Sequence, residues 1–120
     1  MRYTYGTELC KHGRFDEGLR QLEEAVRLCP GFVSARYNIG LIFLKQQRYN
    51  EAIACLTELL RIKPDHFKAC GNLAAAYLAV GKYDEAIRNY KEVLRLQPDS
   101  LEAKQNMEIA IRLKEQAKIN

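Results

Sequence analysis

The chain has 120 residues, of which 48% are hydrophobic and 28% charged, a composition typical of one globular domain and not of a disordered protein. No apolar run approaches the roughly 20 residues of a membrane-spanning helix, and the first residues lack the apolar stretch of a secretory signal. The 19 basic and 15 acidic side chains leave a net charge of +4 that is spread along the chain, whereas a dedicated nucleic-acid binder usually carries a denser basic stripe. We therefore expect no membrane span and no DNA partner.

A period of 34 residues organises the sequence. The only prolines, Pro30, Pro64 and Pro98, lie 34 residues apart. Residues 33–66 and 67–100 align at this offset with 12 identities in 34 positions, and the segment before residue 33 falls into the same register. Three copies of one unit therefore account for residues 1–100.

Each unit is predicted to be a pair of helices, because apolar residues recur at helical spacing on both sides of a polar break. The breaks fall at residues 13–17, 47–51 and 81–85. Each second helix is expected to end before a proline, since the residue that precedes proline is pushed out of the helical region. Asp16, Asn50 and Asp84 are expected to cap the second helices, because a short side-chain oxygen can accept a hydrogen bond from an unpaired amide of the first turn.

Residues 101–120 predict one more helix, which aligns with the first helix of a unit. Glu108 stands there in the place of Gly40 and Ala74, where a neighbouring helix must approach closely. Burial of an unpaired carboxylate would be costly. This helix is therefore expected to end the array and to present a polar outer side.

The spacing Arg36-x2-Ile39-Gly40-x2-Phe43, followed by Ala52-x3-Leu56 and Pro64, resembles the tetratricopeptide repeat, and residues 70–98 carry the same spacing. The resemblance implies an all-α fold, a right-handed superhelix of antiparallel helical hairpins. It divides the chain into a first repeat with a truncated start (1–32), a second (33–66), a third (67–100) and a C-terminal capping helix (101–120). The truncated start suggests a fragment of a longer protein.

The resemblance also implies that the first helix of each hairpin lines a concave groove. At about 100° per residue, the side of the helix opposite Ile39 and Phe43 faces this groove. We expect a partner peptide to contact the residues on that side, which are Tyr37, Asn38, Leu41, Leu44, Lys45, Lys68, Asn72, Leu78 and Asn106. Their apolar members form a strip that the hairpin cores are not expected to need, and exposed apolar patches often mark partner sites.

Asparagine recurs every 34 residues on this side, at Asn38, Asn72 and Asn106. A carboxamide can both donate to and accept from an extended peptide backbone. Two interpretations stay open. Either the asparagines contact a peptide, or asparagine is simply frequent at this position in the family or supports packing between adjacent first helices. Lys45 and Lys68 would favour an acidic neighbour in the peptide.

A non-catalytic scaffold that binds a protein or peptide partner is the function that these features favour. One alternative is a weak homo-oligomer through the solenoid ends, in which Tyr5 and Leu9 stack on the cap of a second molecule. Another is binding of single-stranded RNA, which related helical arrays read one base per repeat. Lys45 and Lys68 are the only bases on the central part of the expected groove, which weighs against RNA.

A third alternative is the carboxylate clamp by which similar repeats grip the acidic tail of a heat-shock chaperone. Asn38 and Lys68 match the residues of that clamp, whereas Thr4 and Asn72 stand where the clamp has an asparagine and a basic residue. A carboxylate needs paired donors, so a partial set puts this function in doubt.

Neither catalysis nor a cofactor is expected within these 120 residues. His12 and His66 fall at a turn and at a repeat junction without a partner motif, so both are expected in solvent. The four cysteines lack the close pairs of a zinc or redox site. We therefore expect no metal site. We also expect the cysteines to be free thiols in a reducing compartment, which favours a cytoplasmic location.

Overall fold

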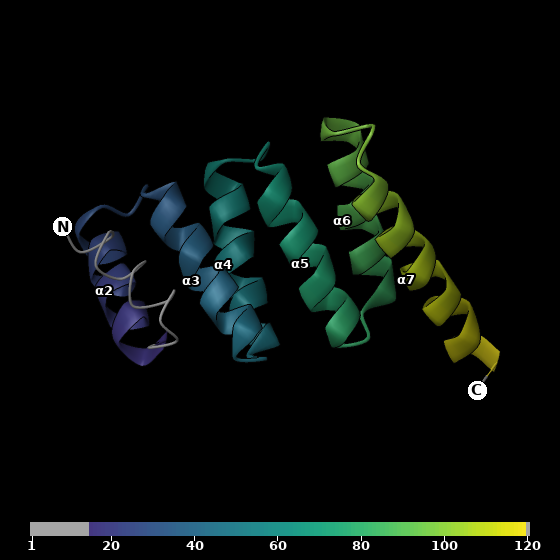
Figure 1. The fold of residues 1–120 in the computed structure, drawn as a ribbon, viewed down its shortest axis with the longest axis horizontal. Helices are drawn as coiled ribbons and strands as arrows, with labels where there is room; N and C mark the ends of the chain where they lie inside the picture. Colours follow the sequence, from purple (N-terminus) through teal and green to yellow (C-terminus); the bar gives the residue numbers. More distant parts are fainter. Residues whose placement is uncertain (1–14, 120) are drawn as a thin grey trace. The chain divides into compact units, whose positions relative to one another are not determined.

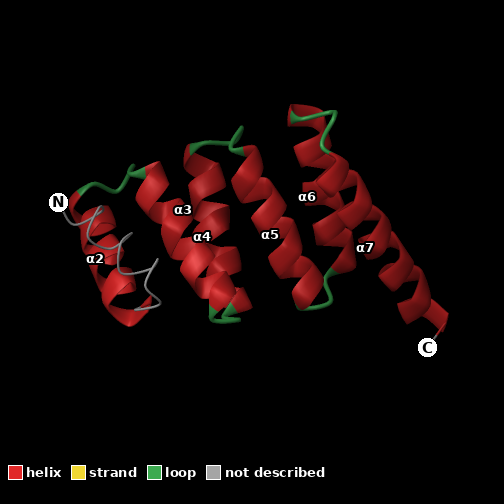
Figure 2. Cartoon of the chain, viewed as in Figure 1, coloured by secondary structure: helices red, strands yellow, loops and turns green. Residues whose placement is uncertain are grey.

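The computed structural model describes residues 15–119, all of whose regular structure is helical. The expected first helix of the first repeat, including Tyr5 and Leu9, lies outside these residues. Figures 1 and 2 show the helices that follow, which are α2 (Phe15–Leu28), α3 (Val33–Lys45), α4 (Tyr49–Ile62), α5 (Phe67–Ala79), α6 (Tyr83–Leu96) and α7 (Leu101–Ile119). The all-α fold class is therefore confirmed.

The chain forms two compact units, Met1–Lys63 and Pro64–Asn120. In the first unit α3 packs against both α2 and α4, and in the second unit α6 packs against both α5 and α7. The pairs α3–α4 and α5–α6 are the two hairpins that the sequence predicts for residues 33–66 and 67–100.

Proline ends the second helix of each pair, as expected. The helices α2, α4 and α6 stop two residues before Pro30, Pro64 and Pro98. The residue before each of the last two prolines, Lys63 or Gln97, has an extended backbone with φ near −135°. This conformation avoids the clash between the proline ring and a helical predecessor.

The expected N-caps of the second helices are wrong. The helices begin one residue earlier, so that Asp16, Asn50 and Asp84 each lie second in their helices, and neither Arg48 nor Lys82 forms a side-chain cap. The amides of these two residues instead donate to Phe43 and Tyr77 and close the preceding helix. Arg48 and Lys82 therefore each end one helix and begin the next. Acidic residues such as Glu51 and Asp84 then lie in the first turn of the second helix, where their negative charge interacts favourably with the helix dipole.

Side chains do cap the first helices of the second unit. The Nδ1 atom of His66 accepts a hydrogen bond from the Ala69 amide at 3.1 Å, and the Ser100 hydroxyl accepts one from the Ala103 amide at 3.2 Å. His66 is half-buried, so the expectation of a solvated histidine is wrong. The His66 ring nitrogen therefore caps the N-terminus of α5 in the same way that the Ser100 hydroxyl caps the N-terminus of α7.

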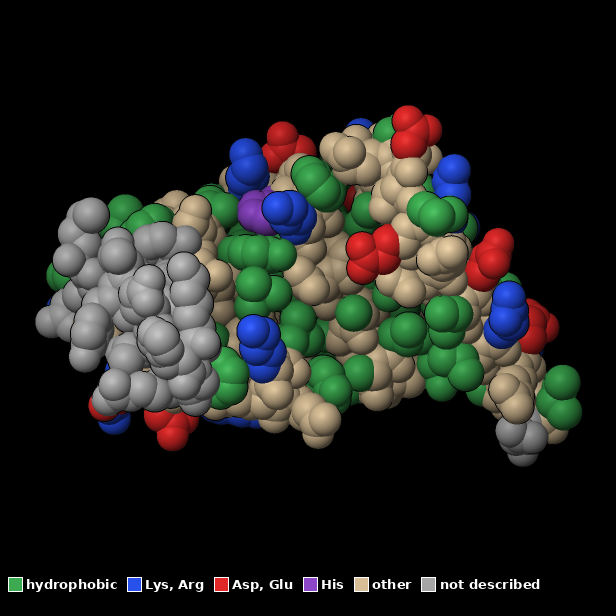
Figure 3. Space-filling view, in the orientation of Figure 1, with side chains coloured by type: hydrophobic (Ala, Val, Ile, Leu, Met, Phe, Trp, Pro, Cys, Tyr) green, Lys and Arg blue, Asp and Glu red, His purple; other side chains and the backbone are tan. Residues whose placement is uncertain are grey.

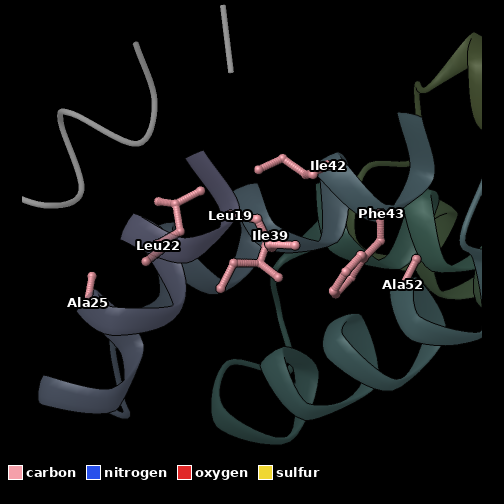
Figure 4. Close-up of a cluster of buried hydrophobic side chains, with 8 residues drawn as sticks. Leu19, Leu22, Ala25, Ile39, Ile42, Phe43 and Ala52 are labelled. Atoms are coloured by element: carbon pink, nitrogen blue, oxygen red, sulfur yellow. The ribbon is translucent and has the colours of Figure 1, made fainter. Parts of the chain in front are cut away.

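A layer of apolar side chains joins the three helices of the first unit (Figure 4). Leu19 and Leu22 of α2 form one buried cluster with Ile39, Ile42 and Phe43 of α3 and with Ala52 of α4. The side of α3 that the sequence predicts to be buried is therefore buried.

Helices α3 and α4 approach each other closely at Gly40. A Cβ atom there would lie 2.7 Å from Cδ2 and 3.0 Å from Cγ of Leu56, whose side chain is fully buried. A glycine inside a helix costs up to about 1 kcal/mol relative to alanine. Its presence in α3 therefore has a packing reason.

The capping helix α7 packs against α6 and buries Ala103 and Ala110, while Glu108 is exposed as expected. Lys114 of α7 forms an ion pair with Asp84 of α6 at 2.5 Å. Hydrogen bonding to Lys114 lowers the pKa of Asp84.

Replacing Gly40 with alanine should destabilise the chain by about 1–2 kcal/mol, because the overpacking against Leu56 outweighs the gain in helix propensity. Urea unfolding followed by circular dichroism measures the change. In a Leu56→Ala background the same substitution should become neutral or stabilising. Equal effects in the two backgrounds would contradict the close contact.

The turns after α3 and α5 offer a matched pair of substitutions. Gln47 has φ +59° and Gly81 has φ +80°, a region in which side chains other than glycine are strained. Gln47→Gly should stabilise the chain by about 0.5–1 kcal/mol, and Gly81→Ala should destabilise it by about 1 kcal/mol. Thermal melting of both variants tests this, and a shift of the same sign in both would refute it.

Candidate functional site

Four of the expected contact residues share one side of α3. Tyr37, Asn38 and Leu41 are half-buried, and Lys45 is exposed in the last turn. We call these residues, together with Leu44, the α3 surface. Leu44 packs against the hydrophobic cluster of the first unit. The expectation that the core does not need this leucine is therefore wrong.

The remaining contact residues lie on two helices of the second unit. Lys68 is exposed and Asn72 half-buried on α5, and Asn106 is half-buried on α7. Leu78 packs against a buried cluster of Ala74, Ala86, Tyr90 and Ala110, so it too belongs partly to the core. We call Lys68, Asn72, Leu78 and Asn106 the α5–α7 residues.

Both asparagines of the first helices bond to their own helix. Asn38 Nδ2 donates to the Ser34 carbonyl oxygen at 3.0 Å, and Asn72 Nδ2 donates to the Lys68 carbonyl oxygen at the same distance. Asn89 of α6 makes the equivalent bond to the Glu85 carbonyl oxygen at 2.9 Å. The amide group of each side chain is thus held along the helix, which fixes its orientation at the surface.

Charged side chains on the second helices pair locally. Glu24–Arg27, Glu58–Arg61 and Glu92–Arg95 form exposed ion pairs that recur at the 34-residue period. Hydrogen bonds to the arginines lower the pKa values of Glu58 and Glu92. In contrast, neither Lys45 nor Lys68 has an ion-pair partner in the part of the chain that the structure describes. These two lysines can therefore pair with a negative charge from outside.

On the face seen in the space-filling view, the basic side chains of the described residues are scattered among acidic, hydrophobic and other side chains (Figure 3). This distribution suits a partner with mixed chemistry better than a nucleic-acid backbone, which binds through several adjacent bases.

The cysteines within residues 15–119 are free thiols. Cys55 Sγ donates to the Arg36 carbonyl oxygen at 3.3 Å, and burial raises the pKa of Cys55 to about 11. Burial also raises the pKa of Cys70. Because the thiolate is the nucleophile, these two side chains are unreactive at neutral pH.

A family model described as tetratricopeptide repeat matches residues 32–99, which is more than half of the chain. The chain belongs to the tetratricopeptide repeat family. The helices α2 to α7 fit three repeats followed by a capping helix, and the segment expected to form the first helix of repeat one lies outside the described residues. Domains of this family are non-catalytic modules of protein–protein interaction. The bounds of the repeats and the cytoplasmic location stay predictions.

Two solved structures of RPAP3 share this fold. The first tetratricopeptide repeat domain of Spaghetti (RPAP3), bound to the HSP90 peptide SRMEEVD, is 21% identical, and the alignment covers 92% of this chain and 88% of that chain with a TM-score of 0.89. The first such domain of human RPAP3 is 19% identical, covers 99% of this chain and 94% of that chain, and has a TM-score of 0.91.

A structure of MamA (AMB-1) is 25% identical with a TM-score of 0.86. The alignment covers 92% of this chain but 61% of that chain, so the present chain spans about three fifths of that relative. Among curated proteins no sequence matches this chain. Within the described residues, no helix is both long and apolar enough to cross a membrane.

Alkylation with iodoacetamide at mildly alkaline pH should modify Cys29, which is exposed, well before Cys55. The high pKa of Cys55 keeps its thiol protonated under these conditions, and its rate should rise steeply only as the pH approaches about 11. Peptide mapping by mass spectrometry resolves the two sites. Modification of Cys55 at the same rate as Cys29 would contradict its burial.

Proposed function

We propose that this chain binds a peptide segment of a partner protein through the α3 surface and the α5–α7 residues. The observation that carries the proposal is that polar and apolar side chains lie together on the side of α3 that faces away from its buried core. Each unit offers its own part of the contact, and the proposal can be tested unit by unit.

The apolar part of the contact would come from Tyr37 and Leu41, whose side chains are half-buried. Partial burial holds such a side chain in one rotamer, so less conformational entropy is lost when a peptide covers it. Leu44 and Leu78 would contribute only the surface that their cores leave exposed. An apolar or aromatic side chain of the peptide would occupy this area.

The polar part would come from the asparagines. Each Nδ2 atom bonds to a carbonyl of its own helix, which holds the carboxamide along the helix surface. A carboxamide can both donate to and accept from a peptide backbone, so we propose that the two asparagines exchange hydrogen bonds with the bound segment. Asn106, at the same register in α7, would extend the contact.

The lysines would select the charge of the peptide. Lys45 and Lys68 are exposed, and a nearby carboxylate would gain from pairing with them. The related RPAP3 domain binds an HSP90 peptide with acidic residues near its end, SRMEEVD. By analogy, we propose that acidic residues flank the apolar anchor of the segment that binds here.

Peptide display against the full chain should select segments that combine an apolar residue with acidic neighbours. For the best of these, replacing both Asn38 and Asn72 with alanine should weaken binding about tenfold, since each lost hydrogen bond costs about 0.5–1.5 kcal/mol. Isothermal titration calorimetry measures the affinity.

Asn89→Ala is the matched control, because Asn89 makes the same bond within its helix but lies on α6, which supplies none of the proposed contact residues. It should leave the affinity unchanged, and all variants should melt within a few degrees of the original chain. If the double variant binds as tightly as the original chain, the asparagines serve only their own helices. Selected peptides without acidic residues would remove the role of the lysines.

A further inference from the structure

The first unit has a pocket on the other side of α3 from Leu41 and Lys45. The helices α2 and α4 both pack against α3, and a pocket of about 490 Å³ opens between them. Its volume is within the range of about 300–1,000 Å³ that is typical of ligand sites. It is lined by Glu23, Val26 and Arg27 of α2, Ile39 and Phe43 of α3, and Glu51, Ala54 and Cys55 of α4.

The floor of this α2–α4 pocket is apolar and firmly held. Ile39 and Phe43 are only 6% and 8% exposed, so they belong to the core of the unit and cannot easily move. The Arg48 guanidinium stacks over the Phe43 ring at 4.6 Å from its centroid and makes two hydrogen bonds to the Glu51 carboxylate, at 2.6 and 2.8 Å. One edge of the pocket is therefore already built in the free protein.

The rim of the pocket is unevenly charged. Arg48 neutralises Glu51, and Arg27 is paired with Glu24. Glu23 is left with no ion pair among the residues that the structure describes. Burial raises the pKa of Cys55, and two nearby charges act on it in opposite directions, with Arg36 lowering it and Glu23 raising it.

We propose that the α2–α4 pocket is a second docking surface, which binds an amphipathic helix of a protein partner that carries a basic residue. One apolar side chain of that helix would cover Ile39 and Phe43, and a lysine or arginine one turn away would pair with Glu23. Side chains three or four residues apart on a helix lie about 5–6 Å from each other, so one helix face can supply both groups. The proposal does not depend on the peptide site of α3, which faces the opposite way.

A designed helical peptide tests the proposal with the full chain. The peptide has about 15 residues, the length at which isolated helices begin to form, with leucines at helical spacing on one face and lysines one turn away. A second peptide has glutamate in place of each lysine. Each is titrated into the isotope-labelled chain, and the amide signals of Val26 and Ala54 report on the pocket.

The lysine peptide should shift these signals and should bind at least tenfold more tightly than the glutamate peptide. Ala54→Trp should weaken its binding about tenfold by filling the pocket, whereas Thr57→Trp, an exposed residue of α4 outside the pocket lining, should not. Glu23→Lys should reverse the preference between the two peptides. This charge reversal is at an exposed position and tests the proposal even if the tryptophan variant unfolds.

Several results would overturn the proposal. They are a dissociation constant for the lysine peptide weaker than about 1 mM, equal binding of the two peptides, or signal changes confined to the α3 surface. Signal changes at Val26 and Ala54 that follow protein concentration without any peptide would assign the pocket to a second copy of the chain, which also contradicts it.

Discussion

The close contact between the two helices of a hairpin is the constraint on which the rest of the structure depends. In the first unit the backbone of α3 at Gly40 meets the buried side chain of Leu56 on α4, and in the second unit Ala74 lies in one cluster with Tyr90 of α6. Only a small residue allows helices to approach so closely. Because this contact fixes the rotation of the first helix, it also decides which side chains face away from the core and can meet a partner.

Helix α3 consequently has two sides with different uses. Ile39 and Phe43 face α2 and α4 and form the floor of the α2–α4 pocket. Asn38, Leu41 and Lys45 lie on the opposite side of the helix, the side that we propose binds a peptide. Exposed charges on the second helices are largely used in local pairs such as Glu58–Arg61, so the lysines of the first helices remain available for an acidic partner. A single helix thus separates the α2–α4 pocket, with Glu23 on its rim, from the surface that carries Lys45.

The helices and their pairing could be predicted from sequence, because the 34-residue period, the prolines and the small residues at Gly40 and Ala74 act locally or repeat. The N-caps could not, since Arg48 closes α3 and opens α4 at the same time, and this double use leaves Asn50 inside its helix. The roles of Leu44 and Leu78 were also missed. A helical wheel places each on the outward side, but long leucine side chains reach back to the core of the unit. The pocket required three helices to be placed together. The pairing of Arg48 with Glu51 did have a signal in the sequence, because a basic residue and a glutamate recur at these two positions in each repeat.

The central claim is that the hairpins stay as they are while the outward side of their first helices receives a peptide. Chemical-shift mapping by NMR, with a display-selected peptide added to the full chain, tests it most directly. The account predicts changes at the backbone and side-chain amides of Asn38 and Asn72 and at the amides of Leu41 and Lys45. The signals of Gly40 and Leu56 should stay in place. Large changes at Gly40 and Leu56, with none at the asparagines, would show that the peptide opens the hairpin and would contradict the account.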